Sequence, residues 1–220
     1  MTRSYESYDV VVIGGGPAGS VAALTARRFY PDRKILVIRK NRRAIIPCAI
    51  PYIFGTLRGV EKIMVSDDTF ERNEIDLIID EVMGIDRENQ KLLTASGTRI
   101  RYDRLVIATG ASPAIPRIKG IDMRGVYPIL KDPDYLLSLY EDVEKAGSVL
   151  IIGGGFVGVE LADDLSLAGK DVHIVEILPH ILSLNFDEEF CLIAESRLRD
   201  VGVKLYLGVS VNRVLGREHA

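Results

Sequence analysis

Two glycine-rich segments repeat the same pattern in this chain, 139 positions apart. The first reads Val-Val-Val-Ile-Gly-Gly-Gly-Pro-Ala-Gly over residues 10–19, and the second reads Val-Leu-Ile-Ile-Gly-Gly-Gly-Phe-Val-Gly over residues 149–158. Each starts as a buried parallel strand would and continues into an Ala- and Leu-rich stretch, 17–29 or 156–167, that is typical of a helix. A further apolar run, 35–38 or 172–175, completes a strand–helix–strand unit. The repeat therefore predicts two related α/β units.

The glycines in each repeat have the spacing that a pyrophosphate-binding turn needs. The first permits a tight turn, the second lets backbone amides approach a phosphate, and the third allows the helix to pack closely on the strand. The helix N-terminus adds partial positive charge. The candidate cofactor-binding residues are Gly14, Gly16, Pro17, Ala18 and Gly19 in the first unit and Gly153, Gly155, Phe156, Val157 and Gly158 in the second. Either turn alone is also compatible with a glycine-rich loop that holds no ligand.

The two units differ at the end of their second strand. In the second unit Glu176 lies eighteen residues after Gly158, where an acidic side chain can accept hydrogen bonds from an adenosine ribose. A carboxylate there repels a 2′-phosphate, and the next three residues include no arginine to receive one, so we expect NADH to be favoured over NADPH. A solvated strand-end glutamate is the alternative. The first unit has Arg39 and Lys40 instead, which could stack on adenine or pair with phosphate but lack the usual ribose contact.

Composition narrows the class of protein further. With 220 residues, 47% of them hydrophobic and 27% charged, and a formal charge of −3, the chain resembles an ordinary globular protein, and nucleic acid is not an expected partner. No apolar stretch reaches the roughly 20 residues that span a bilayer, and the first hydrophobic run leads directly into a glycine turn, unlike a signal peptide. We expect a cytoplasmic location. The two cysteines, Cys48 and Cys191, are too few for a disulfide framework or a metal cluster.

Glycine and proline residues recur between residues 110 and 120, which is typical of a linker. We therefore expect one domain over residues 1–113 and another over 114–220. Residues 91–101 favour a hairpin around a Ser-Gly pair, and residues 105–108 favour a returning central strand. Beyond the second unit, residues 187–201 have helical periodicity, with Cys191 on the apolar face, and residues 203–214 predict two short strands split at Gly208.

Three segments in order, residues 14–19, 102–110 and 153–160, resemble the pyridine nucleotide-disulfide oxidoreductase family. The resemblance implies two Rossmann-like, three-layer dinucleotide-binding units, of which the first binds FAD and the second NADH. It also implies that Ala108, Thr109 and Gly110, at a strand end, return the chain near the flavin. Val82 would offer its backbone to adenine, and Glu160 would lie near the nicotinamide and flavin as a catalytic residue. Ordinary packing or a helix surface would explain Val82 and Glu160 equally well.

Within that family, the segment Pro47–Gly55 is similar to the redox-cysteine segment of the single-cysteine branch. That branch includes NADH oxidases and peroxidases, coenzyme A-disulfide reductases and NADH-dependent polysulfide reductases. Cys48 would be the catalytic thiol, with Pro47 beside it, and a thiolate at the start of a short helix over 51–55 would gain from the helix N-terminus. Its oxidised form could be a sulfenic acid, a mixed disulfide or a persulfide. The alternative is that Cys48 is a small buried apolar residue.

The resemblance covers only about the first half of such an enzyme. Family members return to the FAD domain and end in a C-terminal dimerisation domain, which this sequence lacks, and a full-length form would be a homodimer. Three functions stay open: an FAD-dependent NADH oxidoreductase that reduces a small-molecule electron acceptor (oxygen, peroxide, or a low-molecular-weight disulfide or polysulfide), a truncated, non-catalytic dinucleotide-binding module or subunit, and an electron-transfer reductase for a ferredoxin or rubredoxin. The sequence does not choose the acceptor, and the polypeptide could be a fragment or one piece of a split enzyme.

Overall fold

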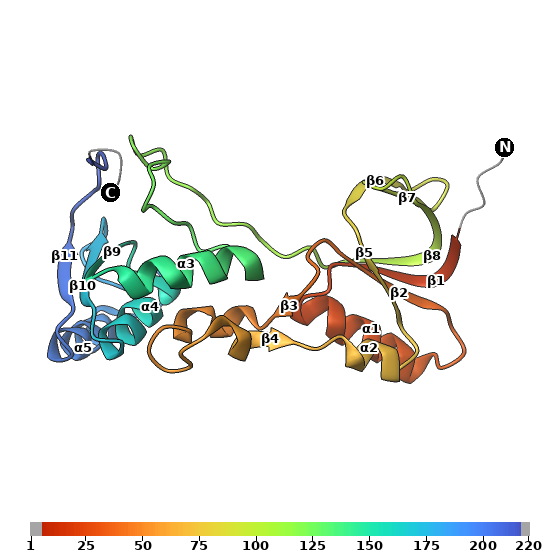
Figure 1. Cartoon of the computed structure of the whole chain (residues 1–220), viewed down its shortest axis with the longest axis horizontal. Helices are drawn as coiled ribbons and strands as arrows, with labels where there is room; N and C mark the ends of the chain where they lie inside the picture. Colours follow the sequence, from red (N-terminus) through yellow and green to blue (C-terminus); the bar gives the residue numbers. More distant parts are fainter. Residues whose placement is uncertain (1–5, 217–220) are drawn as a thin grey trace. The chain divides into compact units, whose positions relative to one another are not determined.

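A computed structural model of the chain describes residues 6–216, which divide into two compact units (Figure 1). The first unit comprises the chain up to Ile46 together with Met64–Ser112, and the second comprises Pro47–Ile63 together with the chain from Pro113 onward. The division expected from the sequence treats residues 1–113 as one continuous piece. In the structure, Pro47–Ile63 instead groups with the second unit.

The first unit is built on a six-stranded sheet in the order β5-β2-β1-β8-β7-β6. The strands are β1 (Glu6–Ile13), β2 (Ile35–Arg39), β5 (Asp76–Ile79), β6 (Val82–Asp86), β7 (Lys91–Thr94) and β8 (Arg99–Ile107). The first four in that order pair in parallel, and β7 and β6 extend them as antiparallel strands. Two helices belong to this unit, α1 (Pro17–Phe29) and α2 (Asp68–Arg72). A separate antiparallel pair joins β3 (Ala44–Ile45) to β4 (Met64–Val65).

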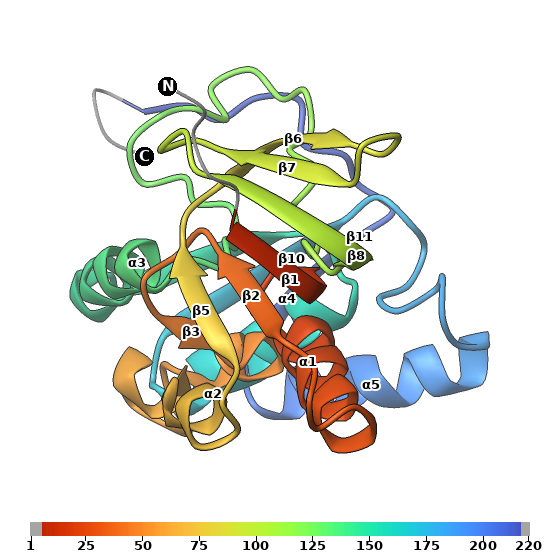
Figure 2. The same cartoon turned by 90° about the vertical axis from the view of Figure 1, so that its right-hand side faces the viewer.

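Alternation along β1 and β2 places apolar side chains on both faces of this sheet, as expected for central parallel strands. One core cluster, on the side of α1 and α2, is Val12, Ala23, Ile35, Val37, Phe70 and Ile75. The other, on the face over which β6 and β7 curl in Figure 2, is Val11, Ile13, Leu36, Ile38, Leu92, Ile100 and Tyr102. The sheet is thus covered on both faces, which fixes the carboxyl ends of β1 and β2 beside the glycine turn.

The second unit has a three-stranded parallel sheet in the order β11-β10-β9. Its strands are β9 (Ser148–Ile152), β10 (Asp171–Glu176) and β11 (Lys204–Leu207). Its helices are the 3-10 helices η1 (Pro47–Tyr52) and η2 (Val60–Ile63) and the α-helices α3 (Pro133–Lys145), α4 (Phe156–Leu167) and α5 (Glu188–Asp200). The helix α4 packs on β9 and β10, and α5 packs on β11.

Both strand–helix–strand units predicted from the glycine repeat are confirmed, and α1 and α4 have the predicted bounds. The hairpin of β7 with β8, the return of β8 beside β1, and the helix over residues 187–201 are confirmed as well. The second strand expected after Gly208 is wrong. Gly208 has φ 68°, and Gly208 and Val209 donate backbone hydrogen bonds to Leu178 and Glu176, so the chain turns over the end of β10.

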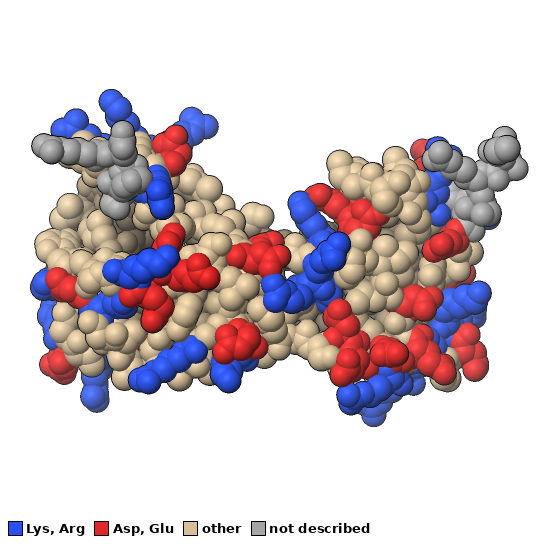
Figure 3. All heavy atoms as spheres, viewed as in Figure 1, with Lys and Arg blue, Asp and Glu red and all other residues tan. Residues whose placement is uncertain are grey.

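Among the helices of the described part, none is long and apolar enough to cross a membrane. On the face drawn in Figure 3, basic and acidic side chains are interspersed over both units.

Candidate functional site

The first glycine turn joins β1 to α1 and is shaped by close approach of its own backbone. Gly14 has φ 108°, and a Cβ there would collide with the carbonyl oxygen of Ala108. A Cβ at Gly19 would collide with the carbonyl oxygen of Gly14, so the helix can approach the strand only without a side chain. Gly16 is the N-cap of α1, with φ −79° and ψ −174°. The first and third glycines are therefore required by the fold, whereas Gly16 is not.

The second turn, between β9 and α4, repeats this geometry. Gly153 has φ 110°, Gly155 has φ −76° and ψ −175°, and a Cβ at Gly158 would collide with the carbonyl oxygen of Gly153. The corresponding angles in the two turns differ by at most 3°. The start of each turn is held alike, because Gly14 donates to Ile38 at 2.8 Å and Gly153 donates to Val175 at 2.9 Å.

Each turn leaves an open space in front of its helix N-terminus. A Cβ built at either Gly16 or Gly155 would meet none of the described atoms within 4 Å. Backbone amides at the start of each helix face outward there, with the positive end of the helix dipole behind them. A pyrophosphate fits this cradle in charge and in hydrogen-bonding type.

Glu176, at the end of β10, is anchored to the second turn. Its carboxylate accepts a hydrogen bond from the Gly154 amide at 2.6 Å and another from the Leu178 amide at 2.8 Å, and the residue is 9% exposed. Ile181 covers Gly154 from the loop that follows. The acidic side chain therefore lies beside the candidate pyrophosphate site, where the sequence places a ribose contact. Binding of a ribose there stays a prediction.

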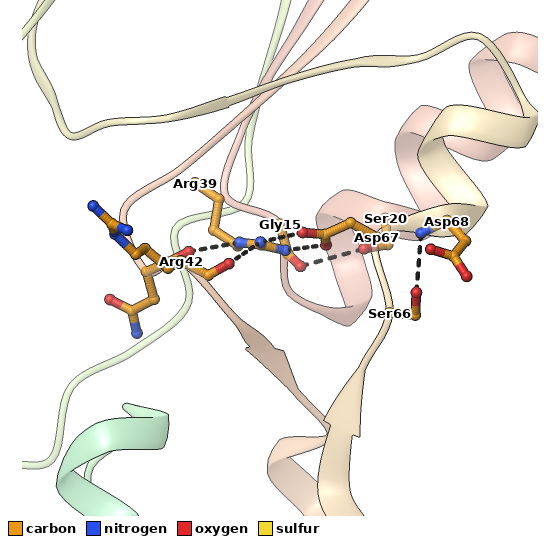
Figure 4. Close-up of polar contacts among 8 residues, drawn as sticks. Gly15, Ser20, Arg39, Arg42, Ser66, Asp67 and Asp68 are labelled. Atoms are coloured by element: carbon orange, nitrogen blue, oxygen red, sulfur yellow. Dashed lines mark hydrogen bonds and ion pairs between the residues drawn. The ribbon is translucent and has the colours of Figure 1, made fainter. Parts of the chain in front are cut away.

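Arg39 lies at the same position of the first unit but makes different contacts (Figure 4). Its stem packs over Gly15, and its guanidinium pairs with both Asp67 carboxylate oxygens at 2.7 Å. It also donates to the carbonyl oxygens of Asn41 and Arg42. Arg39 is 6% exposed. These contacts account for Arg39 without a ligand, and the nucleotide contact expected from the sequence stays a prediction.

Cys48 is exposed and lies in the first turn of η1. The short helix expected over residues 51–55 is wrong in its bounds, because the 3-10 helix begins at Pro47, whose fixed φ suits a helix start. Tyr52, at the other end of η1, faces Glu160 of α4, and burial together with the Glu160 carboxylate raises the pKa of the Tyr52 phenol. Cys48 and Glu160 thus belong to elements of the same unit. Cys191 is 1% exposed in α5, as expected for a core residue.

Five other expected site residues lie at strand ends of the first unit or directly after them. Ala108 donates to Ile13 at 2.8 Å and follows β8, and Thr109 and Gly110 come next, with Gly110 at φ 75°. Val82 begins β6 opposite Thr94, beside a register shift in the ladder. Lys40 is exposed and pairs with Glu81 at 2.9 Å. In the second unit, Phe156 and Val157 are each 48% exposed at the start of α4.

Asp164 was not predicted as a site residue, although it contacts the segment that carries Cys48. It is 2% exposed and accepts four hydrogen bonds from Phe54, Gly55 and Thr56. The signal available in the sequence was its spacing, because Asp164 follows Leu161 by three residues and so falls on the apolar face of the predicted helix.

Comparison with known proteins identifies the family. Residues 8–220 match the family described as "Pyridine nucleotide-disulphide oxidoreductase". An NADH oxidase from Methanocaldococcus jannaschii is 34% identical over 94% of this chain and 49% of its own length. The chain spans about half the length of the curated relatives it matches.

Solved structures give the same result for the fold. A NAD-dependent persulfide reductase from A. fulgidus has a TM-score of 0.87 and 30% identity, over 96% of this chain and 41% of that one. A ferredoxin reductase from Rhodopseudomonas palustris also has a TM-score of 0.87, with 28% identity over 95% of this chain and 52% of that one. These likenesses confirm an α/β fold of the Rossmann-like FAD/NAD(P)-binding class.

Proposed function

The chain belongs to the pyridine nucleotide-disulphide oxidoreductase family, and we propose that it forms the FAD-binding and NADH-binding units of an NADH oxidoreductase that uses Cys48. Members of this family are flavoproteins that bind FAD and NAD(P)H. The observation that supports the proposal best is the pair of matching glycine turns, each with an open space before its helix. From the order of the two turns in the family we assign FAD to the first turn and NADH to the second, where the strand-end carboxylate of Glu176 suits an adenosine ribose without a 2′-phosphate.

The residues of each unit have distinct tasks in this proposal. Gly14, Gly16 and Gly19 would hold the FAD pyrophosphate, and Gly153, Gly155 and Gly158 that of NADH. FAD, when bound, supplies the capacity to take two electrons from a nicotinamide and deliver them to an acceptor. Within the second unit, the Glu160 carboxylate would orient Tyr52 and with it the end of η1.

Cys48 would react directly with a disulfide or polysulfide acceptor. Its thiolate attacks one sulfur, forms a mixed disulfide and expels the other sulfur as a thiolate. Two electrons that originate from NADH then reduce the mixed disulfide, and two protons complete a second thiol and restore Cys48. With peroxide, the Cys48 thiolate would instead take one oxygen atom to become a sulfenic acid and release hydroxide, and two electrons from NADH with two protons would restore the thiol and release water. Oxygen would first have to be reduced to peroxide by two further electrons from NADH. The exposure of Cys48 supports access by a small molecule.

A second candidate is an electron-transfer reductase, favoured by the likeness to the ferredoxin reductase. In that case the acceptor is a protein and Cys48 has no redox task. Replacing Cys48 with serine in the protein that carries activity separates the two, because only the first candidate loses turnover.

The assignment of the two turns is tested by a pair of matched substitutions. Gly16→Val and Gly155→Val each place a side chain in open space on a backbone that any residue can adopt, so each fold should lose only about 1 kcal/mol, the cost of a poorer N-cap residue. We expect Gly155→Val to weaken NADH binding at least 30-fold and to leave FAD binding at the other turn unchanged. Gly16→Val should do the reverse, as measured by isothermal titration.

The control is Gly158→Ala, which should destabilise the second unit because its Cβ has no room. Equal loss of NADH binding in Gly16→Val and Gly155→Val would contradict the assignment of one nucleotide to each turn.

A further inference from the structure

The segment Pro47–Ile63, here named the docked segment, is held on α4 by one buried carboxylate. Asp164 Oδ2 accepts the backbone amides of Phe54 at 3.0 Å and Gly55 at 2.7 Å. Its Oδ1 accepts the Thr56 amide at 2.8 Å and the Thr56 hydroxyl at 2.5 Å. Three successive amides that converge on one anion form a nest, and bonds to a charged acceptor are the strong ones.

Close packing accompanies these hydrogen bonds. A Cβ at Gly55 would collide with the Asp164 carbonyl oxygen and would come within 3.1 Å of Leu167 Cβ, so the docked segment lies directly on the helix. On the side of α3, Phe54 stacks on Tyr140 with ring centroids 5.9 Å apart. Glu160, one turn before Asp164 on α4, faces Tyr52.

The docked segment leaves the first unit and returns to it at a single point. Ala44 and Ile45 pair with Val65 and Met64 in the β3–β4 ladder, directly before and after the segment. Between those ends the described contacts are with α3 and α4 of the second unit. In the sequence, Cys48 therefore lies between two stretches that belong to the first unit, but in the structure it is part of the second unit.

From this arrangement we infer that Asp164 is a positioning residue for Cys48, which fixes the docked segment to the unit that would hold NADH. The inference rests on the proposed function only in taking Cys48 as the redox thiol. Because α4 also begins at the Gly153–Gly158 turn, one rigid helix then sets both the pyrophosphate cradle and the place of the thiol. Asp164 acts through the backbone of residues 54–56 and does not itself react.

The test compares Asp164→Asn with Asp163→Asn in the 220-residue chain. Asp163 is the exposed neighbour on the same helix, so the two variants change charge equally. We expect amide hydrogen exchange at Phe54, Gly55 and Thr56 to become at least tenfold faster in Asp164→Asn alone. Tryptic cleavage after Arg58, inside the docked segment, should accelerate by a similar factor.

Two thiols distinguish positioning from general stability. In Asp164→Asn the rate constant for alkylation of Cys48 should change at least threefold. The change should be in the direction of the rate constant measured for the chain unfolded in urea. Cys191, buried in α5 of the same unit, should stay unreactive. If Cys191 becomes reactive together with the docked segment, or if the Cys48 rate does not change, Asp164 only stabilises the unit and the inference is wrong.

A milder variant covers the case in which Asp164→Asn does not fold. Thr56→Val removes only the hydrogen bond from the Thr56 hydroxyl to Asp164 and keeps the three backbone amide bonds. Because Thr56 is exposed, the substitution should disturb little else. It should speed exchange at residues 54–56 at least twofold, and unchanged exchange overturns the inference. Failure of the unsubstituted chain to bind NADH would count against the proposed function instead, because the exchange and cleavage measurements need no nucleotide.

Discussion

At the residue scale, the two strand–helix–strand repeats differ in the side chain at the end of the second strand. Glu176 uses one lone pair of each carboxylate oxygen for the Gly154 and Leu178 amides, and a carboxylate has about four such sites. Two sites are left for ribose hydroxyls. Arg39 has only donors, and most of them are engaged by Asp67 and two carbonyl groups. At this position, Glu176 can therefore accept hydrogen bonds from a ribose in the second unit, whereas Arg39 only stabilises the glycine turn of the first unit.

Glu176 should give the second unit a preference for NADH. A 2′-phosphate next to this carboxylate is repelled, so we expect NADH to bind at least tenfold more tightly than NADPH, and Glu176→Ala to narrow the ratio to about threefold. The same variant leaves the Gly154 and Leu178 amides without their acceptor and should cost roughly 1–3 kcal/mol of stability. Titration of both nucleotides measures the ratio. Equal affinities in the unsubstituted chain would refute this role of Glu176.

At the element scale, the parts with strong local signals could be predicted from the sequence. The bounds of α1 and α4 follow from glycines that end a strand and an N-terminal turn that starts a helix. The helix α3 was missed although it carries such signals, since Asp132 caps it, Pro133 starts it, and Leu136 and Leu139 are spaced for one buried face.

Contacts between distant segments could not be predicted in this way. The two-residue strands β3 and β4 are too short for any periodicity, and they exist because the chain returns after an excursion of seventeen residues, Pro47–Ile63. The Asp67 partner of Arg39 is 28 positions away, and the Asp164 partners are about 110 positions away. Only tertiary packing decides that a guanidinium or carboxylate turns inward at such sites.

Asp80 links two turns of the first unit and should titrate abnormally. It accepts the Ser96 hydroxyl at 2.6 Å and the Glu81 amide at 2.8 Å, which joins the end of β5 to the β7–β8 turn. The hydrogen bonds, first that from Ser96, lower the Asp80 pKa from 3.8 to about 2. Because the folded-state value is the lower one, this contact stabilises the fold above pH about 4 and is lost as the pH falls through about 2.

Carbon-13 NMR titration of the Asp80 carboxyl should therefore give a midpoint near 2, and Ser96→Ala should raise it toward 3.8. Ser138→Ala, which alters an exposed hydroxyl of α3, is the matched control and should leave the midpoint unchanged. The same Asp80 midpoint in all three proteins would contradict the link between the turns.

At the scale of the whole molecule, the two units would supply different shares of the two proposed nucleotide sites. In the second unit, the glycine turn, the strand-end carboxylate and α4 all come from Pro113 onward and together would form the whole of the proposed ribose and pyrophosphate site. The first unit has the glycine turn and a strand, β6, that begins at Val82. It has an arginine, Arg39, at the position where the second unit has the carboxylate of Glu176. The chain also spans about half the length of its relatives. We therefore expect the two nucleotides to be held unequally by this polypeptide.

FAD should be held by this polypeptide mainly through its adenosine diphosphate end. The contacts predicted for the first unit lie at the adenosine diphosphate end of FAD, and an isoalloxazine ring gains affinity mainly when it is enclosed, at about 25 cal/mol per Å² of apolar area buried. A ring that buries little should add little, so the 220-residue chain should bind ADP and FAD with dissociation constants within about threefold of each other. It should also purify with little flavin and oxidise NADH negligibly. Isothermal titration of ADP and FAD measures the ratio in Gly155→Val, in which the second turn is blocked and ADP reports only the first turn. Adding Gly16→Val should then remove the binding of both ligands. FAD binding a hundredfold tighter than ADP, with bleaching by NADH, would mean that this polypeptide builds a whole flavin site by itself.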